Sequence, residues 1–157
     1  MKSNWKTYAF WVGLSEAAGA VSGLLSMDGM RNFNDTVAQP PLSPPGFLFP
    51  IVWTILYALM GISAARVSMT PPSKERSRGL NLYVIQLAIN FLWSPIFFCL
   101  NAFLFSFFWL LGLLGTVIWM ISEFCKTDKL AARLQIPYVL WLCFAAYLNL
   151  GVWILAH

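Results

Sequence analysis

The sequence predicts an all-α, polytopic membrane protein: a bundle of five transmembrane helices forming one domain over residues 1–157. Composition is the first reason, since 59% of the residues are hydrophobic and 10% are charged, against about 45–50% and 25% in soluble domains. Clustering of the charges is the second, because residues 36–65, 79–122 and 134–156 contain none. Each of these runs reaches the roughly 20 residues that cross the hydrocarbon core of a bilayer.

The uncharged runs also give the order of the helices. A first span is interrupted only by Glu16, and a second begins where Ser43 can cap a helix and two prolines suit its first turn. The run 79–122 is about twice the length of one crossing, so it must turn back, and Asn101 is the residue best suited to that turn. We therefore expect helices near 7–26, 46–69, 80–100, 103–124 and 134–156.

The basic residues predict the orientation. Only Arg31 falls on the far side of the membrane. The other Lys and Arg residues fall on the N-terminal side: Lys2, Lys6, Arg66, Lys74, Arg76, Arg78, Lys126, Lys129 and Arg133. By the positive-inside rule the N-terminus is cytoplasmic. The net charge of +4 is thus a topology signal and does not indicate a nucleic-acid partner. The first span has some features of a cleaved signal peptide, but Glu16 at the end of its apolar part favours a retained helix.

The inventory of reactive side chains excludes several kinds of site. The only histidine is His157, the final residue, so neither histidine acid–base catalysis nor a His-rich metal site is expected. Cys99, Cys125 and Cys143 have no metal-ligand spacing and fall in or beside spans. We expect no metal and no resident cofactor.

Some residues inside the spans are unusual for a plain bundle. Pro95 should kink its helix and release the carbonyl of Phe91, and Asn90 needs a partner in a lipid environment. Trp53 and Trp141 lie two turns or more inside their spans, although Trp prefers the membrane interface. Aromatic residues in line along one helix face are more often helix packing than a ligand site. The depth of these tryptophans in the membrane, beside prolines, nevertheless favours a ligand site.

Three runs resemble the tryptophan-rich sensory protein / translocator protein family, which includes the peripheral benzodiazepine receptor. They are SPPG at 43–46 with FPIVWTILY at 49–57 and MG at 60–61, NFLWSPIFF at 90–98, and AARLQIPYVLW at 131–141 with LN at 148–149. The resemblance covers nearly the whole chain, in order and at the expected spacing. It implies a five-helix bundle, often a homodimer, with a ligand cavity beneath the first loop.

The resemblance also implies ligands and a chemistry. Family ligands are porphyrins, sterols and synthetic drugs of the benzodiazepine and isoquinoline-carboxamide type. Some bacterial members are described as promoting light- and oxygen-dependent breakdown of protoporphyrin, linked to two tryptophans that match Trp53 and Trp141. The implied lining maps to Pro50, Trp53, Tyr57, Asn90, Trp93, Phe97, Trp141, Ala145 and Leu148. Whether such a ligand is transported, sensed or destroyed stays open.

The chain departs from the family pattern at several places. Leu42 stands where the family usually has Trp, and Phe33-Asn34 where it often has Trp-Tyr, which thins the aromatic lid over the cavity. The cholesterol-recognition pattern requires Tyr and a basic residue where this chain has Leu150 and Ile154. Sterol binding is therefore not predicted from that pattern.

Two other readings remain. An intramembrane carboxylate is a candidate proton or ion site, so Glu16 could serve a proton-coupled exporter of small aromatic molecules. The simpler expectation is that Glu16 faces the bundle interior and pairs there with an Asn or a hydroxyl group. A structural or regulatory subunit that binds tetrapyrrole only incidentally is the other. Gly19 and Gly23 form a ridge of small residues that we expect to pack within the bundle.

Overall fold

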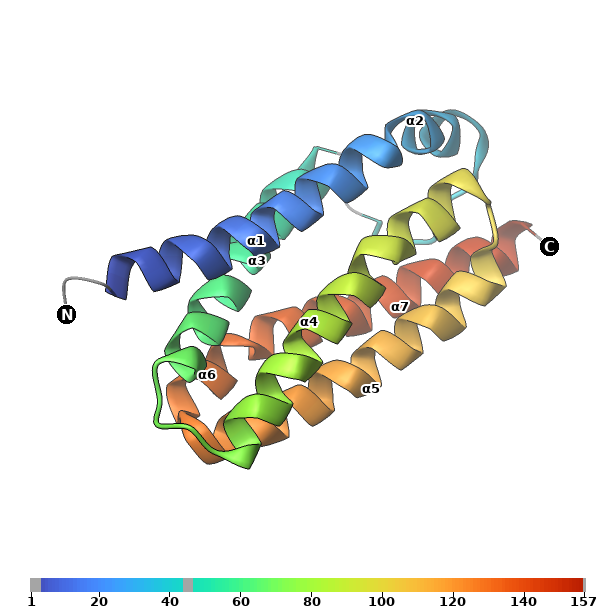
Figure 1. Cartoon of the computed structure of the whole chain (residues 1–157). Helices are drawn as coiled ribbons and strands as arrows, with labels where there is room; N and C mark the ends of the chain where they lie inside the picture. The colour runs from blue at the N-terminus through green and yellow to red at the C-terminus, as the bar shows by residue number, and fades with distance from the viewer. Residues whose placement is uncertain (1–3, 44–46, 157) are drawn as a thin grey trace.

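The computed structural model describes residues 4–43 and 47–156, apart from the side chain of Asn34, and these residues form helices without any strand. The helices are α1 Asn4–Leu25, α2 Met27–Thr36, α3 Leu48–Ser68, α4 Lys74–Ser94, the π-helix η1 Pro95–Cys99, α5 Phe103–Thr127, α6 Lys129–Leu134 and α7 Ile136–Ala156 (Figure 1). The predicted all-α class is confirmed. The expected start of the second span at Pro44-Pro45-Gly46 lies outside the described residues, as does His157.

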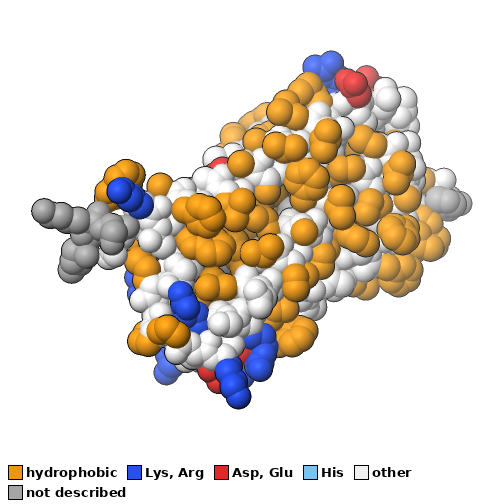
Figure 2. Space-filling view, in the orientation of Figure 1, with side chains coloured by type: hydrophobic (Ala, Val, Ile, Leu, Met, Phe, Trp, Pro, Cys, Tyr) orange, Lys and Arg blue, Asp and Glu red, His pale blue; other side chains and the backbone are white. Residues whose placement is uncertain are grey.

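Four of the helical segments are long and apolar enough to cross a membrane, with mean hydropathies of 1.7 to 2.1: Leu48–Ser68, Lys74–Cys99, Phe103–Thr127 and Lys129–Ala156. A fifth span is obtained if Asn4–Leu25 and Met27–Phe33, which are bent by 58° relative to each other, count as one broken crossing. In the face shown in Figure 2, hydrophobic side chains cover the middle, and Lys and Arg gather near its ends. The chain is thus an integral, multi-pass membrane protein.

The long helices run up and down, and the two termini lie at opposite ends of the bundle (Figure 1). Helix α1 packs mainly on α3, α4 on α5, and α5 on α7. Helix α4 begins at Lys74, earlier than the expected residue 80, because Ser73 caps it: the Ser73 hydroxyl oxygen accepts a hydrogen bond of 3.0 Å from the Arg76 backbone N–H. Helix α2 lies inside what the sequence suggested was a loop.

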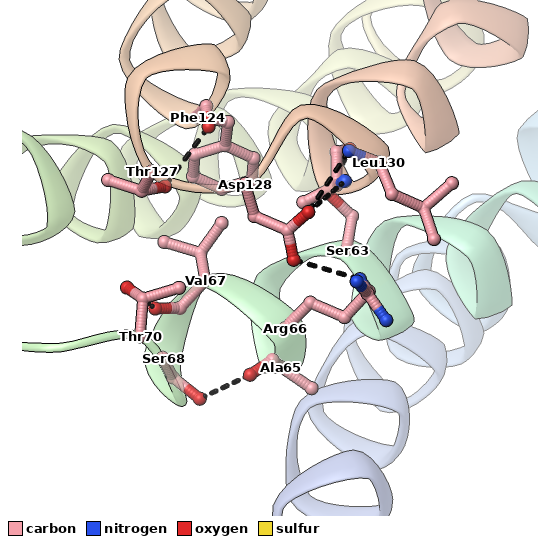
Figure 3. A network of polar contacts seen from close by, with 11 residues as sticks. Ser63, Ala65, Arg66, Val67, Ser68, Thr70, Phe124, Thr127, Asp128 and Leu130 are labelled. Carbon is pink, nitrogen blue, oxygen red and sulfur yellow. Dashed lines mark hydrogen bonds and ion pairs between the residues drawn. The ribbon is translucent and has the colours of Figure 1, made fainter.

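The break between α5 and α6 is fixed by one aspartate (Figure 3). Asp128 caps α6 by accepting hydrogen bonds from the backbone N–H groups of Leu130 and Ala131 at 3.0 and 3.4 Å. Its other carboxylate oxygen lies 2.9 Å from Arg66 Nε at the end of α3. The Ser63 hydroxyl also donates to the Ala131 carbonyl at 2.7 Å. Helix α3 is therefore tied to the α5–α6 turn by polar contacts at this end of the bundle.

The opposite end is shaped by a proline and an asparagine. Pro95 has no N–H to donate to Phe91, and the Ser22 hydroxyl on α1 donates to that carbonyl at 2.7 Å. The π-helix η1 follows, and Asn101 has a φ of 50°, a left-handed conformation that asparagine tolerates. This turn sends α5 back along α4. The released carbonyl is thus used to join α1 to α4.

Close approaches of helices occur at glycines. A Cβ at Gly61 of α3 would lie 2.5 Å from Val12 Cα of α1, so the two backbones meet there. A Cβ at Gly19 would lie 2.2 Å from Tyr57 Cε2, whereas one at Gly23 would meet no atom within 4 Å. Of the two ridge glycines, only Gly19 therefore packs closely within the described chain.

Candidate functional site

The tryptophans singled out by the sequence meet in an aromatic group between α3 and α7, here called the indole cluster: Phe49, Trp53, Tyr57, Tyr138 and Trp141. Trp53 stacks on Tyr57 with ring centroids 5.4 Å apart and 29° between the planes. Trp53 and Trp141 stand edge to face, 6.3 Å apart at 89°, and Phe49 lies 5.8 Å from Trp141. The two indoles thus form two walls at a right angle.

These walls are incompletely covered. The side chains of Trp53 and Trp141 are only partly buried, although Tyr57 and Tyr138 beneath them are buried. The indole nitrogen of Trp141 is itself buried, and no described residue accepts its hydrogen bond. A buried N–H without a partner costs free energy, so this donor is available to an acceptor on a bound molecule.

A chain of polar side chains lies beneath the indoles. The Tyr57 hydroxyl donates to Asn90 Oδ1 at 2.7 Å, and Asn90 Nδ2 donates to the Tyr138 hydroxyl at 2.7 Å. The Tyr138 hydroxyl in turn donates to Gln86 Oε1 at 2.8 Å. Asn90 therefore finds the partners that a lipid environment demands of it, and its hydrogen bonds hold α3, α4 and α7 together.

A second aromatic group, the phenyl cluster, lies at the end of the bundle near η1 and contains Phe33, Trp93, Phe97, Phe98 and Phe103. Trp93 stacks on Phe97 at 4.9 Å and 21°, and Phe33 of α2 lies 5.2 Å from both Phe97 and Phe98. The loop change at Phe33 thus supplies a ring that is packed down onto η1. Helix α2 thus covers part of this cluster through Phe33, while Trp93 and Phe98 stay partly buried.

One asparagine satisfies the polar groups of that end of the bundle. Asn149 Oδ1 accepts from Trp93 Nε1 and from the Ser106 hydroxyl, each at 3.2 Å, and Asn149 Nδ2 donates to the Phe103 carbonyl at 2.7 Å. The loop after α2 runs over the same end of α7, where the Tyr147 hydroxyl donates to the Pro41 carbonyl at 2.6 Å. These bonds fix α7 against α4 and α5.

The structure thus divides the residues expected to line one cavity. Trp53, Tyr57 and Trp141 belong to the indole cluster, and Ala145 packs against the same core. Phe97 and Trp93 belong to the phenyl cluster, and Trp93 also packs against the main hydrophobic core. The remaining three lie apart from these rings or beneath them: Asn90 in the polar chain, Leu148 partly buried, and Pro50 exposed at the start of α3.

Sequence reasoning did not assign a role to Gln86 or to the Tyr138 hydroxyl. Gln86 precedes Asn90 by four residues, so the two share one helix face. Two amides on one face of an apolar helix indicate a polar layer, and this signal could have located Gln86. The Tyr138 hydroxyl on α7 meets Asn90 and Gln86 on α4, which are 48 and 52 residues away in the sequence. No local pattern indicates that pairing.

Glu16 lies on α1, partly buried, next to Ser15, whose hydroxyl hydrogen-bonds the Tyr83 hydroxyl of α4. Neither a hydrogen bond nor an ion pair joins the Glu16 carboxylate to another residue in the part of the chain that the structure describes. The expected pairing of Glu16 with an amide or hydroxyl is therefore not seen there.

Comparison with known proteins identifies the family. The family model described as TspO/MBR matches residues 11–154. The chain is 37% identical to Protein CrtK of Rhodobacter capsulatus over 87% of this chain and 84% of that protein. It is 33% identical to the tryptophan-rich protein TspO of Chlorobaculum tepidum over 93% of each, and 33% identical to the translocator protein of Ovis aries over 75% of this chain and 71% of that protein. The chain belongs to the TspO/MBR family.

Proposed function

We propose that this protein binds a flat, conjugated, hydrophobic ligand, with porphyrins as the leading class, against the indole cluster. The observation that carries the proposal is the right-angled pair of partly covered indoles, Trp53 and Trp141, with the buried Trp141 N–H finding no acceptor among the described residues. A ring system placed against one indole face and the other indole edge gains about 0.5–1.5 kcal/mol per aromatic pair beyond the burial of its area.

The polar groups near the indoles suit such a ligand. The Trp141 N–H could donate to a propionate or carbonyl oxygen at the rim of the ring. The Tyr57 hydroxyl is engaged with Asn90, so the amide chain supports the pocket wall without needing to contact the ligand. Recognition would then rest on stacking, one indole hydrogen bond and the apolar surroundings.

For chemistry, the cluster offers oxidisable indoles in place of an acid or a base. We propose that light excites the bound porphyrin, that Trp53 or Trp141 passes an electron to the excited ring, and that the reduced ring passes it on to dioxygen as superoxide. The indole radical cation then takes an electron back from the ring, and the oxidised ring combines with superoxide, so that one porphyrin and one dioxygen give one oxygenated, bleached ring and the indole is restored. The first electron transfer requires the indole type of ring, because phenylalanine is far harder to oxidise. Transport or sensing of the same ligand would need binding alone.

Titration of the purified protein with protoporphyrin in detergent tests binding. In the dark we expect saturable quenching of Trp fluorescence. Trp53→Ala and Trp141→Ala should each weaken binding about tenfold, the equivalent of ~1.4 kcal/mol lost with one stacked pair. Trp5→Ala is the matched control, since Trp5 is 65% exposed at the start of α1. Non-saturable quenching, or equal affinity in all variants, contradicts the proposal.

Illumination of the same samples in air tests the chemistry separately. Trp53→Phe combined with Trp141→Phe keeps an aromatic surface and removes both indoles. The loss of porphyrin absorbance per bound ligand should stop in this double variant while the wild type bleaches its ligand. An unchanged photoproduct yield would rule out the indoles as electron donors and leave a binding function.

The alternative, a proton-coupled exporter, is favoured by one observation: the Glu16 carboxylate lies in a span without a described partner. Reconstituted vesicles with an imposed pH gradient would test it. Proton-driven movement of an aromatic cation that is abolished by Glu16→Gln supports the exporter. Equal movement with and without the gradient argues against it.

A further inference from the structure

Two grooves follow one another on the outer surface of α4 and α5, and neither is lined by the indole cluster. The first, called the basic groove, has a volume of about 780 Å³, and its lining includes Ser73, Lys74, Ser77, Arg78, Ile85 and Trp119. The second, called the apolar groove, has a volume of about 480 Å³ and is lined by Ile89, Phe105, Phe108, Trp109, Gly112 and Thr116. One groove is charged at its outer end and the other is apolar throughout.

The two grooves share the same side of both helices. Ile85 and Ile89 are one turn apart on α4, and Thr116 and Trp119 are three residues apart on α5, so each pair lies on one helix face. The Trp109 indole N–H donates to the Ile89 carbonyl at 2.9 Å and joins the helices at the apolar groove. The grooves therefore form one track that runs down the α4–α5 seam.

The length of this track matches one leaflet. Arg78 and Ile89 are separated by 11 residues of continuous helix, or about 17 Å at 1.5 Å per residue. Half of the hydrocarbon core of a bilayer is about 15 Å. Trp119, which is 54% exposed, lies where an interfacial tryptophan belt is expected, between the charged and the apolar parts.

The charges of the basic groove are suited to an anion. Lys74 and Arg78 are both exposed, and none of the described residues that line the groove is acidic. Arg78 Nη1 lies 3.2 Å from Glu123 Oε1, but the same oxygen is also 3.5 Å from Lys126 Nζ. Lys74 has no hydrogen bond or ion pair with another described residue. The groove thus presents more positive charge than its surroundings neutralise.

We propose that this track binds one anionic phospholipid from the leaflet on the side of the α3–α4 loop. Its phosphate lies at Lys74 and Arg78, and one acyl chain runs past Ile85 and Ile89 over Gly112. The glycine makes room for the chain, since a Cβ added at Gly112 would meet no atom within 4 Å. A phospholipid fits because one molecule carries both the anion and an apolar tail of the right length.

A second copy of the chain fits this surface less well. A symmetric dimer in a membrane has its two-fold axis along the membrane normal, so identical ends of the two copies meet. Pairing through this track would bring two sets of Lys74 and Arg78 together at one end. Like charges that face each other are destabilising, whereas an anionic headgroup neutralises them.

Native mass spectrometry of the delipidated protein, after incubation with phosphatidylglycerol or with phosphatidylcholine of the same chains, tests the proposal. The wild type should retain phosphatidylglycerol in preference, by about fivefold (~1 kcal/mol) for each basic residue that contacts the headgroup. Lys74→Gln with Arg78→Gln should bring the two lipids to equal retention. The matched control is Lys129→Gln with Arg133→Gln, which removes two exposed basic residues at the same end of the bundle, outside the groove.

A block of the tail path provides a second readout. Gly112→Leu projects into open space, so it should leave thermal unfolding unchanged and reduce the retention of both lipids. Lys74→Gln alone removes no hydrogen bond and should shift the lipid ratio in the same direction by about fivefold. Full phosphatidylglycerol preference in the double variant, an equal loss in the control, or a changed monomer–dimer ratio with unchanged lipid retention would each overturn the proposal.

Discussion

The indole cluster and the phenyl cluster are both rich in aromatic rings, but they differ in how completely they are covered. In the phenyl cluster Phe97 is 3% exposed, Phe33 and Phe103 are 8% exposed, and the Trp93 N–H has an acceptor in Asn149. In the indole cluster Trp53 and Trp141 are partly exposed, and the Trp141 N–H has no acceptor among the described residues. Trp93 and Phe98 of the phenyl cluster are also only partly buried, so the clearest difference is the indole N–H, which finds an acceptor within the phenyl cluster and finds none among the described residues around Trp141.

This difference separates packing from binding more clearly than aromatic content does. A ring that is fully enclosed has made its dispersion contacts already and can offer them to no ligand. A partly covered ring leaves surface that a ligand can contact, and an unpaired hydrogen-bond donor beside the ring can orient that ligand. The phenyl cluster should therefore contribute mainly to stability, and the indole cluster mainly to ligand affinity.

The largest expected effect is on stability, from truncating Phe97 in the phenyl cluster and Phe144, which contacts Trp141 of the indole cluster. Phe97→Ala removes an enclosed ring and leaves a cavity, which should lower the free energy of unfolding by about 3–5 kcal/mol. Phe144→Ala removes a partly buried ring that contacts Trp141 at 5.5 Å, and should cost less than half of that. Unfolding by SDS in mixed micelles, followed by far-UV circular dichroism, measures both. Equal losses would show that the two regions are packed alike.

Much of this arrangement was predictable from the sequence, and the reason differs between elements. Charge-free runs predict spans because lipid excludes charge, so the bundle could be predicted from composition together with the positions of the charges along the chain. The placing of Trp53 beside Trp141 came from the family resemblance. Local periodicity could not find it, because a residue on α3 and a residue on α7 meet only through the packing of the whole bundle.

Other features depend on interactions that the sequence does not display. Helix α2 forms within a polar segment and is held by Phe33, whose partners on η1 and α5 are distant in the sequence. The division of the expected lining into two clusters depends on Trp93 and Asn149 finding each other across α4 and α7. Pro95 predicts that the Phe91 carbonyl is released from its helix. That this carbonyl accepts a hydrogen bond from Ser22 could not be predicted without the position of α1.

A medium effect is expected from a single methyl group behind the indole cluster. Gly19→Ala places a Cβ 2.2 Å from Tyr57 Cε2, which forces the tyrosine ring to move against Trp53. Overpacking of this kind costs about 1–3 kcal/mol, and porphyrin affinity should fall as well. Gly23→Ala is the matched control on the same helix, because its Cβ meets nothing within 4 Å. A Gly19 variant with the stability and affinity of the Gly23 variant would mean that Tyr57 can move freely.

The smallest effect on stability should come from removing an indole N–H in each cluster. Trp93→Phe deletes the donor to Asn149 Oδ1, and a hydrogen bond between membrane helices contributes about 0.6 kcal/mol, with a maximum near 1.7. Trp141→Phe deletes a donor without a described partner, so stability should stay level or rise, since an unmet buried donor is a cost in the unliganded protein.

SDS unfolding without ligand and again with saturating porphyrin separates the two cases. Added porphyrin should stabilise the wild type and Trp93→Phe by similar amounts, and Trp141→Phe by less, because only Trp141 is expected to donate to the ligand. If Trp141→Phe lowers stability without ligand, its N–H already has an acceptor within the protein, and the indole cluster is closed in the same way as the phenyl cluster.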